Sequence, residues 1–127
     1  MKVPINFFMT VNASSKKTQT SKRISFPFRI RRVRVHFPIG SELNLPVSII
    51  LSNDPTIPTT AAPDGVNILQ SLGGYPTIQG NDETFDINLD MKVRERGKYI
   101  KVYGENKDAT NGHYVYGIVE IESLGGE

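Results

Sequence analysis

The chain has 127 residues, a length that suits one domain, and its hydrophobic content of 38% fits a folded protein rather than a disordered tail. It has no cysteine, which excludes disulfides, a thiolate nucleophile and cysteine-bound zinc. The net charge of +2 hides a division, because the first 40 residues carry nine of the fifteen Lys and Arg and none of the thirteen acids. No apolar run approaches the roughly 20 residues of a membrane helix, and polar residues interrupt the N-terminal segment, so we expect neither a membrane span nor a signal peptide.

The chain begins with apolar residues that alternate with polar ones over residues 3–11, which predicts a first strand. The following segment, 12–22, is polar, small and basic, and it predicts a flexible arm. We therefore expect an N-terminal strand and basic flexible arm over residues 1–22, a β-sandwich domain over 23–123, and a C-terminal tail over 124–127.

The next strand changes phase in its middle. Apolar residues occupy even positions from Ile24 to Ile30 and odd positions from Val33 to Phe37. A shift of one residue turns every side chain to the opposite face of a sheet. The sequence therefore predicts either a β-bulge at residues 31–32 or a corner at which the chain passes from one sheet to another.

The rest of the chain also alternates with a period of two. Further strands are expected at 43–51, 84–93, 98–104 and 113–123, and the segment 66–72 is the one short helix candidate. Loops rich in Pro, Gly and Thr separate them, notably 52–65. About eight strands in a chain of this length predict an all-β fold, a two-sheet antiparallel β-sandwich that is jelly-roll-like.

Residues suited to catalysis or metal binding are few. His36 and His113 lie far apart in sequence and show no zinc spacing, so we expect no enzyme, no metal and no cofactor. Asp82, Asp86 and Asp90 fall on one face of a predicted strand. That face is interpreted as the solvated side of the strand, with a calcium edge or a glycosidase carboxylate pair as alternatives.

The basic residues are the candidate partner-binding site. They are Lys16, Lys17, Lys22, Arg23, Arg29, Arg31, Arg32 and Arg34. One interpretation is a solvated sheet face whose arginine stems cover apolar surface. The alternative is a basic stripe that contacts the acidic half of a neighbouring copy, giving a homo-oligomer or a contact with other structural proteins. Nucleic acid is less favoured, because alternation sends the nearby phenylalanines to the core, where they cannot stack on bases.

The basic segment followed by "RISFPFRIRRVRVHFP" and by long loops such as "DPTIPTTAAPDG" resembles the small single jelly-roll proteins of virions. The resemblance covers about residues 23–123 and concerns architecture, so no family residue is transferred. It implies a structural protein of a capsid or its decoration, located in the virion. The alternative is a glycan- or ligand-binding β-sandwich module, for which an aromatic contact face is expected from Tyr99, Tyr103, Tyr114 and Tyr116.

Overall fold

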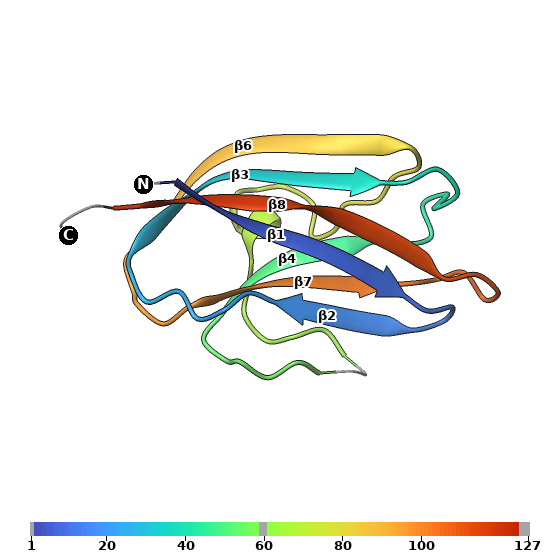
Figure 1. Ribbon diagram of the computed structural model, residues 1–127, viewed down its shortest axis with the longest axis horizontal. Coiled ribbons are helices and arrows are strands. Elements are labelled where there is room, and N and C mark those ends of the chain that lie inside the picture. Colours follow the sequence, from blue (N-terminus) through green and yellow to red (C-terminus); the bar gives the residue numbers. More distant parts are fainter. Residues whose placement is uncertain (1, 59–60, 125–127) are drawn as a thin grey trace.

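Two antiparallel sheets of four strands each pack face to face in the computed structural model, which describes residues 2–58 and 61–124 (Figure 1). Sheet A has the order β1-β8-β3-β6, formed by β1 (Lys2–Val11), β8 (His113–Ser123), β3 (Phe28–Phe37) and β6 (Glu83–Val93). Sheet B has the order β2-β7-β4-β5, formed by β2 (Lys16–Thr20), β7 (Tyr99–Glu105), β4 (Val47–Ser52) and β5 (Val66–Asn67).

The strands pair in a nested order: the first strand pairs with the last, the second with the second to last, and the two middle strands with each other. β1 pairs with β8, β2 with β7, β3 with β6, and β4 with β5. The chain is thus one long antiparallel hairpin wrapped into two sheets, which is the jelly-roll arrangement. The predicted all-β sandwich of about eight strands is confirmed.

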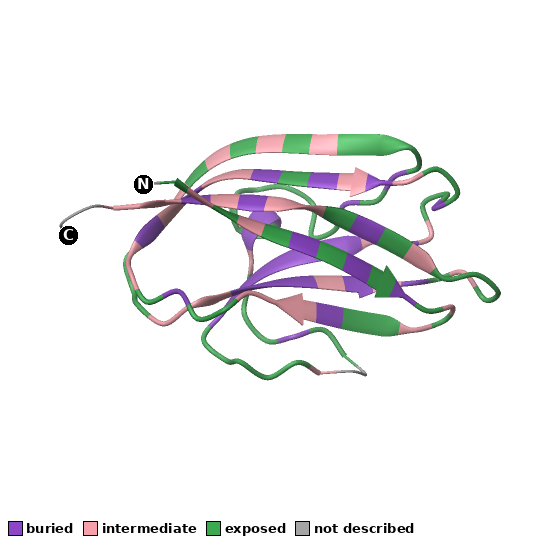
Figure 2. Ribbon diagram, in the orientation of Figure 1, coloured by how far each residue is buried: buried purple, intermediate pink, exposed green. Residues whose placement is uncertain are grey.

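The core lies between the sheets and is filled by the alternating apolar residues of both. In sheet A, Val33, Val35 and Phe37 of β3 are fully buried, and Val115 and Val119 of β8 lie beside them. Figure 2 shows the resulting bands of buried and exposed residues along β1 and β3. This period-two burial is what the sequence pattern predicted.

The phase change in β3 is a β-bulge. The register of β3 against both β6 and β8 shifts between Ile30 and Arg32, so both halves of the strand keep their apolar residues in the core. Ile24 lies before the strand and forms an isolated bridge with Lys98. Of the two alternatives drawn from the sequence, the bulge is the correct one.

The expectation of a flexible arm over residues 12–22 was wrong, because residues 16–20 form the edge strand β2. This short edge strand buries one side chain, Thr18. Its sequence therefore lacks the alternation of apolar and polar residues that predicts a strand. β4 is shorter than expected and begins at Val47, after Glu42 and Leu43 adopt positive φ. Of the expected tail over 124–127, residues 125–127 lie outside the described part of the chain.

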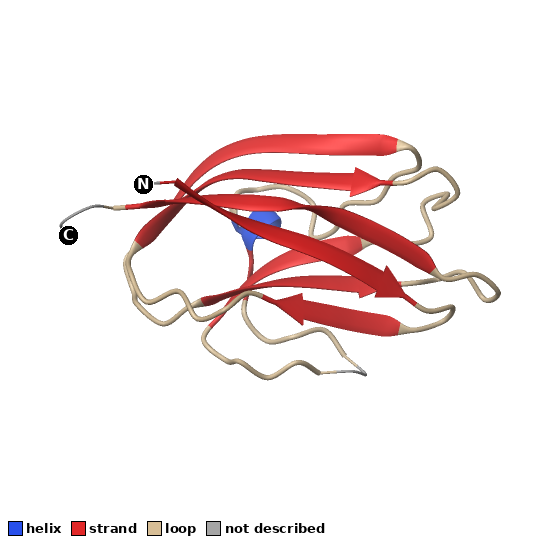
Figure 3. Cartoon of the chain, viewed as in Figure 1, coloured by secondary structure: helices blue, strands red, loops and turns tan. Residues whose placement is uncertain are grey.

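The predicted short helix is present as α1 (Ile68–Ser71), capped by the Asn67 side chain, which accepts from the Gln70 amide. Figure 3 shows it as a single turn among strands and loops. Within residues 2–58 and 61–124, no helix is long and apolar enough to cross a membrane.

Candidate functional site

The outer face of sheet A is divided into a charged half and an aromatic half. Because the four strands are in register, the outward side chains form rows that cross the sheet. One row runs from Phe8 through Tyr116 and His36 to Thr84, and it is aromatic and polar. In the rows nearer the chain termini, each of three β3 arginines stands opposite an acid on one neighbouring strand. Arg34 faces Asp86 of β6, and Arg32 and Arg29 face Glu120 and Glu122 of β8.

The charged half is held together by ion pairs within the chain. Arg32 donates from Nε and Nη2 to the two carboxylate oxygens of Asp86 at 2.7 and 2.6 Å. Arg29 Nε lies 2.8 Å from Asp90 Oδ1, an ion pair without the alignment of a hydrogen bond, and Nη1 lies 3.9 Å from Glu122. Two of the four β3 arginines are therefore paired with acids of the same chain.

The aspartates of β6 serve the same arrangement. The hydrogen bond from Arg32 lowers the pKa of Asp86, although burial opposes the effect. Asp82 lies in the turn before β6 at φ 52° and does not belong to the strand face. Among the described residues no group of three His, Asp or Glu side chains forms a metal site. The geometry thus agrees with a solvated, ion-paired strand face.

The other predicted basic residues do not form one stripe with these arginines. Lys16 and Lys17 are exposed on edge strand β2 of sheet B, where Lys16 stands opposite Glu105. Lys22 lies in the following loop, and Arg23 extends over the turn at Gly97. Lys16 and Lys17 therefore belong to a different sheet from the arginines, and the expected single basic surface is corrected to several separate ones.

The aromatic half carries a cluster of rings that stands in solvent. The Phe8 ring is stacked on Tyr114 and Tyr116 at centroid distances of 5.4 and 6.1 Å, and His36 lies 5.0 Å from Tyr116. Phe8 is 60% exposed and both tyrosines are 41% exposed. An exposed cluster of large rings on a strand face is a feature of binding surfaces.

A groove of about 460 Å³ lies beside these rings. We call it the aromatic groove and define it by Asn6, Phe8, Arg34, His36, Thr84 and Tyr116, which line it. Its volume falls within the range of small-ligand sites, and its lining combines rings with a few polar groups, as such sites do.

Arg34 is the one basic residue in this lining. It is exposed, and within the described residues its guanidinium makes neither a hydrogen bond nor an ion pair. Its charge lowers the pKa of Asp86, but that carboxylate is already engaged by Arg32. A free guanidinium beside aromatic rings is suited to bind a carboxylate or another anion.

The predicted face of four tyrosines is wrong. Tyr114 and Tyr116 lie on sheet A, whereas Tyr99 and Tyr103 lie on β7 of sheet B, where they stand opposite serines of β4. Tyr99 and Tyr103 are half-buried, and burial raises the pKa of Tyr103. The sequence analysis missed Phe8, although two consecutive phenylalanines in an alternating strand place one of them outward.

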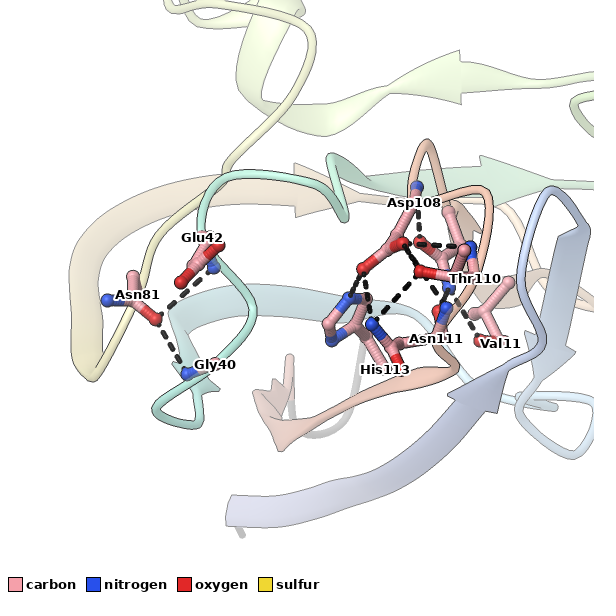
Figure 4. A network of polar contacts seen from close by, with 9 residues as sticks. Val11, Gly40, Glu42, Asn81, Asp108, Thr110, Asn111 and His113 are labelled. Atoms are coloured by element: carbon pink, nitrogen blue, oxygen red, sulfur yellow. Dashed lines mark hydrogen bonds and ion pairs between the residues drawn. The ribbon is translucent and has the colours of Figure 1, made fainter.

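Both histidines make local polar contacts. His36 Nδ1 lies 2.7 Å from the Thr84 hydroxyl, in the groove. His113 Nε2 lies 2.8 Å from Asp108, whose carboxylate also accepts from the amides of Thr110 and Asn111 (Figure 4). These contacts lower the pKa of Asp108, with the Thr110 amide as the largest cause. They hold the 106–112 loop in shape, which is a structural role.

The neighbouring loops at this end of the molecule are fastened in a similar way. The Asn81 side-chain oxygen accepts from the amides of Gly40 and Glu42 at 2.8 and 3.2 Å (Figure 4). The buried Asn106 side chain donates to the carbonyl oxygens of Val11 and Asn111. The loops around the aromatic half are therefore tied to each other and to β1.

Comparison with protein-family models and with curated proteins finds no match to this chain. The function is therefore inferred from the geometry of sheet A.

Proposed function

We propose that the protein is a non-enzymatic structural subunit, of the kind that builds or decorates a virion, and that it binds copies of itself or neighbouring structural proteins. The observation that carries the proposal is the exposed cluster of Phe8, Tyr114 and Tyr116 on one face of the jelly roll. Rigid aromatic side chains that stand in solvent supply large contact area at low entropic cost when a partner covers them.

Two arginines of β3 support the same proposal, because acids of the same chain already pair with them. Arg29 and Arg32 are engaged within the chain, so a partner would first have to displace Asp90 and Asp86. Nucleic acid is the less favoured partner, because Arg34 and Lys17, which are unpaired within the described residues, lie on different sheets and do not form one continuous phosphate-binding surface. Both histidines and the β6 aspartates also have structural partners, which supports a role without catalysis.

The test is molecular mass by light scattering against protein concentration, at roughly 50 mM and 1 M salt, between which the Debye length falls from about 14 to 3 Å. We expect a concentration-dependent oligomer that persists at high salt, because apolar contacts are not screened. The variant Phe8→Ser should give a smaller species, and the matched control Lys17→Ser should not. A monomer under every condition contradicts self-assembly, and dissociation by salt alone would move the contact to the lysines and arginines.

The second candidate function is a glycan- or ligand-binding module, and the aromatic groove favours it specifically. Tyr116 and Phe8 offer apolar faces, while Arg34, Asn6 and Thr84 offer polar groups at the rim. This candidate predicts a monomer whose tyrosine fluorescence changes on titration with acidic monosaccharides. Tyr116→Ala should abolish the change and Tyr75→Ala, an exposed tyrosine outside the groove, should preserve it.

A further inference from the structure

We infer that the free edge of β6 pairs antiparallel with β6 of a second copy, so that two A sheets join into one continuous sheet across a two-fold axis. The inference rests on the proposed structural role and deepens it, because it names the partner and the contact. It concerns a different surface from the aromatic groove. The two sheets have four edges, and each edge exposes backbone groups unless it is protected.

The edge formed by β1 is protected. Pro4 removes one amide donor from the strand, and the Phe8 amide donates to the Gln19 side-chain oxygen of β2 at 3.2 Å. β1 and β2 contact each other, so the two sheets close against one another on this side. A further strand cannot easily add here.

The two edges of sheet B are protected by other means. β2 has five residues and begins with Lys16 and Lys17, both exposed. Lysines on a short edge strand oppose pairing with another strand, because the pairing would bring their charges together. β5 has two residues and offers almost no ladder.

Apart from Lys92 near its end, β6 has none of these protections. It is an eleven-residue edge strand without proline or glycine, and within the described residues its backbone bonds only to β3 (Figure 1). Its inward side chains Phe85, Ile87, Leu89 and Met91 are only half-buried, because the two-residue β5 does not extend far enough to cover them (Figure 2). A long, regular edge with incompletely buried apolar residues is what strand addition requires.

There is also room for the side chains of an added strand. A groove of about 340 Å³ separates Ile87 and Leu89 from the segment after α1, and Leu69, Leu72 and Ile78 line its other wall. A second strand beside β6 would place its inward side chains at the mouth of this groove. Burial of these surfaces would supply the apolar contribution that main-chain pairing alone lacks.

The sequence of β6 selects one register for self-pairing. With Leu89 on the two-fold axis, the inward pairs are Leu89 with Leu89, Ile87 with Met91 and Phe85 with Val93, all apolar. The outward pairs then place Asp86 opposite Lys92, and Asn88 opposite Asp90. Opposite charges and amide–carboxylate pairs thus face each other on the outer side.

The adjacent registers place like charges, or a charge and an apolar side chain, opposite each other. An axis at Asn88 places Asp86 opposite Asp90, and an axis at Asp90 places that residue opposite itself. An axis at Ile87 places Glu83 opposite Met91 on the inward face. Since an antiparallel two-fold contact uses both β6 edges, the assembly closes as a dimer instead of extending as a fibre.

The test uses the absence of cysteine, which lets one introduced thiol report the register. Leu89→Cys should form a disulfide-linked dimer under oxidised glutathione, because opposed Cβ atoms lie about 5 Å apart. The matched control is Met91→Cys, on the same face and equally half-buried, whose two copies would stand roughly 13 Å apart along the strands. We expect at least a tenfold faster crosslink at position 89, and equal rates at the two positions would overturn the register and the pairing.

A second pair of variants tests the β6 edge by charge substitution, without a crosslink. Ile87→Lys places a charge at the open edge and should prevent dimer formation, whereas Ile5→Lys, at a half-buried position on the closed β1 edge, should not. Circular dichroism identifies any lysine variant that does not fold. If one does not fold, the crosslinking rates at positions 89 and 91 alone test the inference. An oligomeric wild type whose position 89 crosslinks no faster than position 91 overturns this inference and leaves the proposed function standing. A monomeric wild type without crosslinks overturns both.

Discussion

Arg32 and Asp86 face each other across β3 and β6 in a two-pronged contact, with Nε 2.7 Å from Oδ1 and Nη2 2.6 Å from Oδ2. The two residues are 54 positions apart in the chain and meet because the jelly roll pairs early strands with late ones. A basic first half and an acidic second half therefore become complementary neighbours in one sheet. The charge division of the sequence favours this wrapping over pairings between strands of the same half.

The first prediction follows from that contact. Arg32→Glu should lower the urea midpoint of unfolding, because it sets a carboxylate beside Asp86 and Glu120. The double variant Arg32→Glu with Asp86→Arg should recover part of the loss by restoring an opposite-charge pair. Lys17→Glu is the control, since Lys17 is exposed on β2 opposite Gly104, and its midpoint should hardly move. Equal losses for Arg32→Glu and Lys17→Glu would mean that net charge alone matters.

Much of the fold could be predicted because it depends on local alternation. The strands at β1, β6 and β8 follow from period-two burial. The phase change in β3 predicted either a bulge or a corner between sheets, and the structure has the bulge, between Ile30 and Arg32. β2 could not be predicted in this way. It buries only Thr18, and its place in sheet B comes from pairing with β7, which is 80 residues away or more.

The candidate site was predicted less well, for a topological reason. Which outward residues come together depends on strand order, and that order sets Phe8 beside Tyr114 and Tyr116 while it sends Tyr103 to the other sheet. Arg32 was expected to contact acids of a neighbouring copy. The strand order instead places it beside Asp86 of the same chain. Local patterns identify which side chains face outward, but only the register between strands identifies their neighbours.

The second prediction concerns acid. The folded-state pKa of Asp108 lies below its ordinary value, so its interactions stabilise the fold fully above an unfolded pKa of about 3.9 and are lost as the pH falls through the folded value. We expect the urea midpoint to fall as the pH is lowered from about 5 to 2. Asp108→Asn should unfold more easily at pH 7 and show a weaker dependence on acid. Asp64→Asn, at an exposed position in the loop between β4 and β5, is the control and should leave the profile unchanged.

The third prediction concerns a close approach between β8 and β3. A Cβ atom on Gly117 would lie against the Arg34 carbonyl oxygen and 3.0 Å from the Phe7 ring, so the backbone of one strand would have to move. Gly117→Ala should therefore cost about 1–3 kcal/mol of unfolding free energy, the range for overpacking a filled site. Gly112→Ala is the matched control, because its nearest neighbour would stand 3.5 Å away, an ordinary contact. A neutral Gly117→Ala would show that the strands separate here at no cost.

The fourth prediction concerns Lys101, whose ammonium is buried beneath the loop after β4. The side chain is 1% exposed, and Nζ donates to the Thr56 carbonyl oxygen at 2.6 Å. Lys101→Met keeps the apolar volume and removes the donor, so global stability should change little, because a charge no longer has to be buried. The loop over residues 53–58 should however open more often, since it loses a charge-assisted hydrogen bond.

Hydrogen exchange measures that opening directly. The amides of Asn53, Asp54, Thr56 and Ile57 should exchange roughly tenfold faster or more in Lys101→Met, as the loss of a hydrogen bond to a charged group implies. Lys107→Met, an exposed lysine on another loop, should leave these amides unchanged. Unaltered exchange in Lys101→Met would show that the Lys101 hydrogen bond does not hold the loop in place, and that hydrogen bonds within the loop, such as that from the Thr56 amide to Asp54, are sufficient.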